Sequence, residues 1–92
     1  MSKERRLTAA LVDASPDLLA YFRRRVDPQD APDLLGEVMV TAWRCAKDVP
    51  STSVETRMWL FGVARGALRN YQRGDRRRWA LADRIRGSIS AA

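Results

Sequence analysis

The stretch that decides the fold is MWLFGVARGALRNYQRGDRRR, residues 58–78, which carries two patterns at helical spacing. Its apolar residues recur as in a helix that faces a core: Leu60, Val63, Ala64, Ala67, Leu68 and Tyr71. Arginines repeat every four residues on another face, at Arg65, Arg69, Arg73 and Arg77. A packed face backed by arginines suits a helix that lies against a phosphate backbone. The alternative is a solvated basic face, which is common on helices.

The net charge of the chain comes from its C-terminal part. Residues 1–50 hold 8 Lys+Arg and 8 Asp+Glu, whereas residues 51–92 hold 9 arginines, no lysine and 3 acids, a balance of +6. A field localised in this way attracts an anion to one surface and leaves another surface for a different partner. Arginine also offers a planar fork that matches phosphate oxygens and base edges. The charge distribution therefore favours a nucleic-acid partner.

Length and composition limit the class of protein. A chain of 92 residues, 46% of them hydrophobic, can form one domain with a modest core. No apolar run approaches the ~20 residues of a membrane span, and we see no signal peptide. A single cysteine, Cys45, and the lack of histidine argue against a disulfide framework and most metal sites, and fit a reducing cytoplasm. With no histidine, no paired inward acids and no phosphate loop before a strand, we expect no enzyme, cofactor or metal.

The pattern predicts an all-α fold, a compact bundle of three principal helices plus a short N-terminal helix, since nothing alternates with a period of two. Leu7 and Leu11 indicate the short first helix. Ser15 and Pro16 are typical of a helix start, and they predict that the second helix runs from there to about Val26.

The next helix is predicted from about Pro32 to Lys47, with Asp30 as its cap. Its expected stripe, with Trp43 firmly in the core, is Leu35, Val38, Met39, Ala42, Trp43 and Ala46. Residues 48–53 (DVPSTS) form a loop by turn chemistry. Thr52, with Glu55 three residues later, is a capping box that opens the arginine-rich helix.

The end of the arginine-rich helix is a second boundary. Gly74 is a candidate break in it. After Arg78, Leu81, Ile85 and Ile89 recur at steps of four, which predicts a weak amphipathic helix that frays at residues 90–92. We therefore expect residues 1–79 to form the domain and residues 80–92 to be the start of an inter-domain linker or a frayed helix.

Two motifs carry a family resemblance: DLLGEVMVTAWR (33–44) and, after a short loop, the stretch 58–78. In this order they resemble region two of bacterial sigma factors, most closely the extracytoplasmic-function (ECF) group. The resemblance covers about residues 8 to 79. It implies the minus-ten recognition module of a transcription factor that binds core RNA polymerase, opens the promoter and has no catalysis of its own.

The resemblance implies a polymerase-binding face on the first motif. In the family this helix docks on the clamp coiled-coil of the largest polymerase subunit, and the matching residues here are Asp33, Leu34, Glu37, Thr41 and Arg44. Gly36 stands where the family usually has Gln, which removes a hydrogen-bonding side chain and costs about 1 kcal/mol in helix propensity relative to Ala. Without the resemblance, Asp33 and Glu37 are equally well explained as acids that complement the helix dipole.

The resemblance also implies that the second motif and the loop before it recognise and open the minus-ten element. In ECF factors the non-template strand is held with one base extruded into a pocket formed partly by this loop. The loop here, residues 48–54, lacks the family's Phe-Gly character but offers hydroxyl groups. The implied DNA-binding residues are Ser51, Thr52, Ser53, Arg65, Arg69, Asn70, Arg73, Arg76 and Arg77.

Some of these residues have a plainer explanation. Thr52 is more simply a helix cap, and an Asn such as Asn70 can pair with adenine or merely face solvent. Trp59 fits a buried position better than a stacking platform for bases. Gly62 and Gly66 would allow close approach of a phosphate backbone or tight helix packing.

Two alternative functions stay open. Anti-sigma proteins bind this fold over the same two surfaces, so the chain could be an interaction module that such a regulator sequesters. A standalone basic nucleic-acid-binding protein is the other alternative, and it predicts nothing special about residues 33–37. No helix-turn-helix module for the minus-thirty-five element follows residue 92, so we expect either an excised domain or a protein that works without that module. We expect a cytoplasmic location, with no membrane or small-molecule partner.

Overall fold

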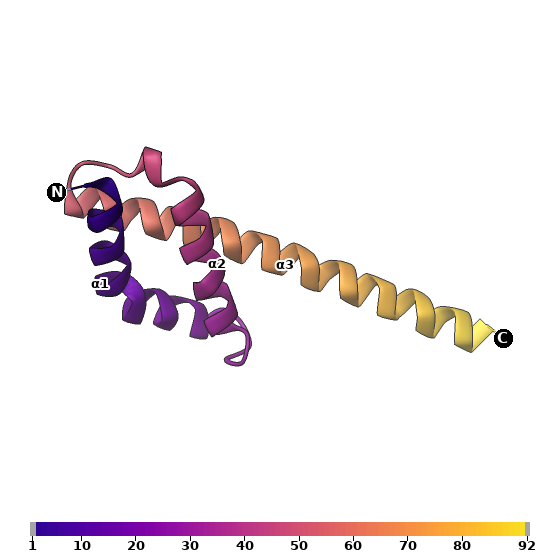
Figure 1. The fold of residues 1–92 in the computed structure, drawn as a ribbon. Coiled ribbons are helices and arrows are strands. Elements are labelled where there is room, and N and C mark those ends of the chain that lie inside the picture. Colours follow the sequence, from indigo (N-terminus) through magenta and orange to yellow (C-terminus); the bar gives the residue numbers. More distant parts are fainter. Residues whose placement is uncertain (1, 92) are drawn as a thin grey trace.

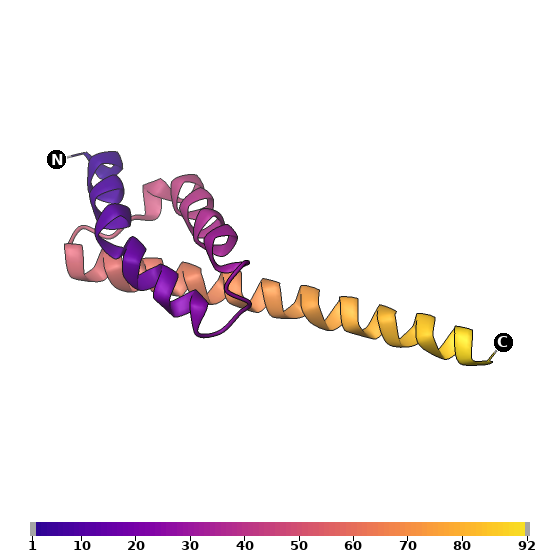
Figure 2. The same cartoon turned by 90° about the horizontal axis from the view of Figure 1, so that it is seen from below.

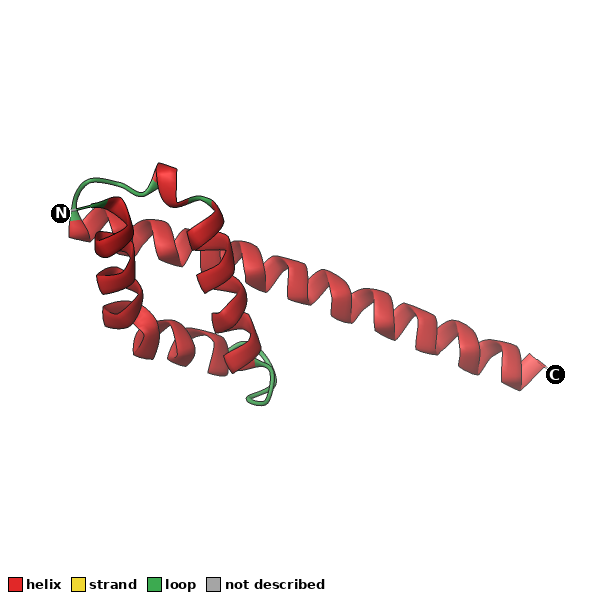
Figure 3. Cartoon of the chain, in the orientation of Figure 1, coloured by secondary structure: helices red, strands yellow, loops and turns green. Residues whose placement is uncertain are grey.

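The computed structural model describes residues 2–91, with their side chains except those of Trp79 and residues 88–91. These residues form three α-helices and one short 3-10 helix, namely α1 (Lys3–Arg23), α2 (Ala31–Arg44), η1 (Ala46–Asp48) and α3 (Ser53–Ala91) (Figure 1). Figure 3 shows helices and loops over this range, and the predicted all-α class is confirmed. Of the predicted C-terminal pattern, residue 92 and the Ile89 side chain lie outside the described residues.

The predicted break between two N-terminal helices is wrong, because α1 is continuous and contains Pro16. One apolar stripe runs along the whole of α1 and is buried: Leu7, Leu11, Ala14, Leu18 and Phe22. Ser15 does not cap a helix; its hydroxyl donates to the Leu11 carbonyl oxygen at 2.5 Å. The cap is Ser2, whose side chain accepts a hydrogen bond from the Arg5 amide at 3.2 Å. Burial of the continuous stripe outweighs the local preference of Pro16 for a first turn.

The helix α1 bends near its middle, as Figure 1 shows. Pro16 has no amide hydrogen, so one backbone hydrogen bond of the helix is missing there. The bend directs the N-terminal half of α1 toward the start of α3 and the loop between α2 and α3.

The helix α2 begins at Ala31, with Pro32 in its first turn as predicted, and ends at Arg44 rather than Lys47. Its buried residues are Ala31, Leu34, Val38 and Ala42, a stripe rotated from the predicted one. Trp43 is 44% exposed, so its predicted place in the core is wrong. Leu34, which the predicted stripe did not include, is buried at 2% exposure. Leu34, Val38 and Ala42 lie four residues apart and face one direction, and both neighbouring helices pack against α2.

The helix α3 begins at Ser53, directly after Thr52, as the predicted capping box requires. The Thr52 hydroxyl accepts a hydrogen bond from the Glu55 amide at 3.2 Å. The helix then continues through Gly74 to Ala91, so neither the candidate break nor a separate C-terminal helix is present. Leu60, Ala64 and Leu68 are buried, as their spacing predicts, and Trp59 is half-buried.

The core lies where the three helices meet. Its largest fully buried side chains come from all of them: Phe22, Leu7, Leu18, Leu60 and Val38. Val49, from the loop after η1, is also buried and joins this core. Figures 1 and 2 show that α3 crosses beneath α1 and α2 and that its C-terminal half projects beyond the bundle, which gives the molecule a length of 65 Å.

Two polar contacts join α3 to distant parts of the chain. Near the start of α3, Arg57 pairs with Asp17 of α1 and lies 3.9 Å from Asp13. Further along, the Tyr71 hydroxyl donates to the Asp30 carboxylate at 2.6 Å. Asp30 occupies the cap position of α2 but makes no side-chain cap bond, so its carboxylate serves α3 instead. These contacts fix how α3 lies against the other helices.

The Tyr71–Asp30 contact makes stability depend on pH in the alkaline range. The hydrogen bond to Asp30, assisted by burial, raises the pKa of the Tyr71 hydroxyl from 10.0 to about 12. The fold therefore favours the neutral hydroxyl, and this contribution is complete below pH 10 and is lost as the pH rises toward 12. We expect Tyr71→Phe to be less stable than wild type at pH 8, with a difference that narrows above pH 10. Urea unfolding of both proteins across this range measures the difference, and a gap that stays constant would contradict the assignment.

Candidate nucleic-acid and polymerase interfaces

The exposed side of α3 is basic. We call it the arginine face, and it comprises Arg65, Arg69, Arg73, Arg76 and Arg77, all exposed. Most of this face lies opposite the buried stripe of Leu60, Ala64 and Leu68, because the helical period places it there. In the part of the chain that the structure describes, none of the five joins an ion pair. The arginine face therefore keeps its positive charge available.

The acids nearby are already engaged. Asp75 pairs with Arg78 at 2.6 Å and Asp83 pairs with Arg86 at 2.5 Å, each across three residues of α3. Exposed pairs of this kind contribute little to stability. Their consequence here is electrostatic, because each acid is balanced by an arginine that is not on the arginine face.

Two glycines of α3 lie on the same exposed side. Gly62 and Gly66 are both exposed, and a Cβ built on either would meet nothing within 4 Å. Tight helix packing within the domain therefore does not explain them.

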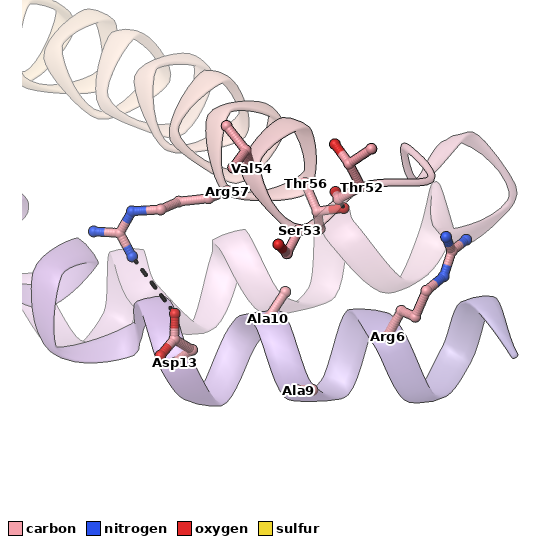
Figure 4. Close-up of a pocket in the computed structure, with 9 residues that line it drawn as sticks. All are labelled: Arg6, Ala9, Ala10, Asp13, Thr52, Ser53, Val54, Thr56 and Arg57. Atoms are coloured by element: carbon pink, nitrogen blue, oxygen red, sulfur yellow. Dashed lines mark hydrogen bonds and ion pairs between the residues drawn. The ribbon is translucent and has the colours of Figure 1, made fainter. Parts of the chain in front are cut away.

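A cavity of about 490 Å³ opens between the N-terminal half of α1 and the start of α3 (Figure 4). It is lined by Arg6, Ala9, Ala10, Asp13, Thr52, Ser53, Val54, Thr56 and Arg57. Figure 4 shows Arg6 at one end of it and the Arg57–Asp13 pair at the other, with Ser53 between the two helices above Ala10. Ala9, Ala10 and Val54 supply apolar groups to its lining, and Thr52 and Ser53 supply hydroxyl-bearing side chains.

The hydroxyl groups of the loop and of the start of α3 differ in the hydrogen bonds that they form and in whether they line the cavity. The Thr52 hydroxyl caps α3, as the plainer reading held. The Thr56 hydroxyl is buried and is satisfied by the Thr52 carbonyl oxygen at 2.7 Å. Ser53 lines the cavity, whereas Ser51 is exposed outside the lining. Of the three predicted loop residues, Ser53 is thus the one whose hydroxyl is best placed for a ligand in the cavity.

The outer face of α2 presents the other predicted set. Asp33, Glu37, Thr41 and Arg44 are all exposed, and with Gly36 and Val40 they line a shallow groove along the helix. Leu34 differs from these residues, because it is buried at 2% exposure and faces the core. It therefore holds α2 in place and offers no surface to a partner of the free domain. We call the four exposed residues the α2 outer face.

The two surfaces point in different directions. The α2 outer face lies opposite the stripe of Leu34, Val38 and Ala42, and the arginine face lies mostly opposite the stripe of α3. Because the two stripes pack toward a common core, their opposite sides face away from each other. Asn70 is exposed on α3 between Arg69 and Arg73 in sequence. Because the α2 outer face and the arginine face point in different directions, one bundle can contact two partners at once.

The described residues hold no group of three or more His, Cys, Asp or Glu side chains that could bind a metal ion. Within the same range, no helix is both long and apolar enough to span a membrane. Two features of the site were missed from the sequence, namely the contribution of α1 to the cavity and its contacts with the loop.

In a comparison with known protein families, the model of sigma-70 region 2 matches residues 11–78. The chain belongs to the sigma-70 region 2 family. Region 2 is a DNA-binding domain of transcription initiation, and membership implies promoter recognition of the sigma-factor type, with promoter DNA and core RNA polymerase as partners. No curated protein and no solved structure matched the chain. Within this region 2 domain, the match begins inside α1 and extends along α3 to Arg78.

Gly36 of this region 2 domain weakens α2 for no reason visible within the bundle. A Cβ at this position would meet nothing within 4 Å, and the backbone is helical. We therefore expect Gly36→Ala to raise the free energy of unfolding by about 1 kcal/mol, the difference in helix propensity between the two residues. Urea unfolding measures the change, and Gly62→Ala, which is equally open, is the matched control. A destabilised Gly36→Ala beside a stabilised Gly62→Ala would show that the space at Gly36 is needed for the fold.

Proposed function

We propose that this region 2 domain is the minus-ten recognition and strand-opening module of an ECF-type sigma factor. The α2 outer face would bind the clamp coiled-coil of core RNA polymerase. The arginine face and the loop before α3 would hold the non-template strand. The observation that carries the proposal is that the predicted polymerase-binding residues, Leu34 apart, and the predicted DNA-binding residues are exposed on different elements of one bundle, in a chain of this family.

The arginine face supports the phosphate contacts. Its five guanidinium groups are exposed and without acidic partners among the described residues, so binding DNA breaks no ion pair within the domain. Each arginine that neutralises a phosphate releases counterions, which gives affinity without sequence preference. Gly66, between Arg65 and Arg69, and Gly62, one turn earlier, would let a strand approach the α3 backbone. This surface would therefore supply affinity rather than specificity.

The loop and its cavity support base recognition. A base taken out of the stack costs a few kcal/mol, which hydrogen bonds to its edge and a fitting pocket must offset. A cavity of about 490 Å³ exceeds the room that one base needs, and Ser53 offers a donor and an acceptor beside it. Asn70 could read a neighbouring base, since an amide can pair with adenine at two positions. These residues would therefore supply specificity.

The α2 outer face supports polymerase binding by its charge pattern. Asp33 and Glu37 lie one turn apart and are exposed, whereas most of the cations of the chain lie on other elements. A basic partner helix would meet these two carboxylates first. Arg44 at the far end of the face would fix the direction in which such a helix docks.

Substitutions should separate affinity from specificity. We expect Arg73→Ala to weaken binding of the domain to all single strands alike and to lower the salt slope by about one unit. We expect Asn70→Ala and Ser53→Ala to change base preference at one or two positions and to leave the salt slope unchanged. Fluorescence anisotropy with oligonucleotides of varied sequence, at several salt concentrations, measures both quantities. The reverse result, with Arg73→Ala altering preference and the other two altering only overall affinity, would overturn these roles.

A charge reversal tests the α2 outer face. Glu37→Arg places a cation where a basic helix would dock, and we expect it to weaken binding to core RNA polymerase by at most a few kcal/mol. Folding should be unaffected, because an exposed substitution away from caps and core shifts stability by no more than about 0.5 kcal/mol. Glu4→Arg makes the same charge change on α1 and is the control. Co-purification with core polymerase is the measurement. Wild-type binding by a folded Glu37→Arg domain would favour the standalone nucleic-acid-binding alternative.

A further inference from the structure

The loop between α2 and α3 is held by α1 at both of its ends. The Lys3 ammonium donates a hydrogen bond to the Lys47 carbonyl oxygen at 2.8 Å. The Arg6 guanidinium donates from Nη1 to the Ser51 carbonyl oxygen, also at 2.8 Å. Lys3 and Arg6 are three residues apart on α1, so they lie on one side of the helix. Both precede the residues that match the family, so membership assigns them no role.

The loop has limited support of its own around Ser51. In η1, the amides of Asp48 and Val49 donate to the carbonyls of Cys45 and Ala46 at 2.9 and 3.2 Å. Val49 is anchored in the core. Among the described residues, Arg6 is the donor to the Ser51 carbonyl oxygen. The conformation of the loop at this point therefore depends on a side chain of α1.

Arg6 is placed differently from the other arginine beside it. It is half-buried, it forms one end of the cavity, and its Nε is buried with no hydrogen-bond partner among the described residues. An unpaired buried donor carries a cost, so this guanidinium is not merely a solvated surface charge. Arg5, by contrast, is exposed, and its side chain forms no hydrogen bond or ion pair with the described residues. Arg5 and Arg6 therefore carry the same charge in two different environments, one exposed and one half-buried.

We propose that Arg6, assisted by Lys3, is a positioning residue that fixes the loop and the wall of the cavity for recognition of a base of the single strand. This inference rests on the proposed function of the loop. Arg6 acts through the backbone of Ser51, two residues before Ser53, and so sets where the Ser53 hydroxyl lies across the cavity. Direct contact of Arg6 with a phosphate is the competing explanation, and it predicts a change in the salt slope.

The test compares Arg6→Ala, Lys3→Ala, Arg6→Lys and the matched control Arg5→Ala. The probe is the single strand that the wild-type chain enriches most from a random-sequence pool, with a scrambled strand of the same composition as reference. Two quantities are measured for each protein. The first is the hydrogen-exchange rate of the Asp48 and Val49 amides, and the second is the affinity ratio of the two strands at several salt concentrations. Thermal unfolding confirms that each variant is folded.

We expect Arg6→Ala to accelerate exchange at both amides and to lower the affinity ratio by about threefold to tenfold, as for the loss of one or two ordinary hydrogen bonds. Its salt slope should equal that of Arg5→Ala, because neither residue touches the strand. Lys3→Ala should act in the same direction to a smaller extent, and Arg6→Lys should recover part of the ratio since it keeps a donor. Arg5→Ala should leave both exchange and ratio at the wild-type values.

Two results would overturn the inference. Unchanged exchange in Arg6→Ala would mean that Arg6 does not hold the loop. Faster exchange with an unchanged affinity ratio would mean that the position of the loop does not matter for recognition. Failure of the proposed function looks different, because the wild-type chain itself would then enrich no sequence from the pool, and the exchange measurement would still decide whether Arg6 holds the loop.

Discussion

The structure depends on one apolar stripe of α3, which both other helices must share. Leu60 and Ala64 are fully buried and Leu68 nearly so, and α1 and α2 both pack against α3. Ala64, in the middle of this stripe, is small enough to let two helices approach α3 closely. A helix that is buried along one side in this way can present charge only on the opposite side. The arginine face is thus a geometric consequence of the core.

The polar contacts around the core restrict the arrangement rather than create it. Arg57 with Asp17, Tyr71 with Asp30, and the two bonds from α1 to the loop each join residues at least 40 positions apart. They lie at or near the surface, where such contacts contribute modestly to stability. Their value lies in fixing the rotation of each helix about its own axis. That rotation decides which side chains reach the surface, and so it links packing to the two proposed interfaces.

The sequence predicts those parts of the structure for which helical spacing and capping residues give a clear signal. The period of α3, its cap at Thr52 and the exposure of Glu37 and Arg73 follow from helical spacing, and they agree with the structure. The prediction that Trp43 is buried was wrong because two apolar stripes, one of them including Trp43, fit the helical spacing of α2 equally well. Only the packing of α2 against both neighbouring helices decides which of the two stripes faces the core. The contacts of α1 with the loop could not be predicted, since their acceptors are backbone carbonyls, which every residue has.

The projecting half of α3 gives the domain a mechanical property. Among the residues whose side chains the structure describes, Tyr71 is the last apolar residue of α3 that packs against the core, and the helix then continues without interruption to Ala91. At a rise of 1.5 Å per residue this is an arm of about 30 Å. If the anchored half tilted within the bundle by about ten degrees, the far end would move by about 5 Å. Small adjustments of the bundle on its partners would therefore be amplified into a displacement at the far end of this helix.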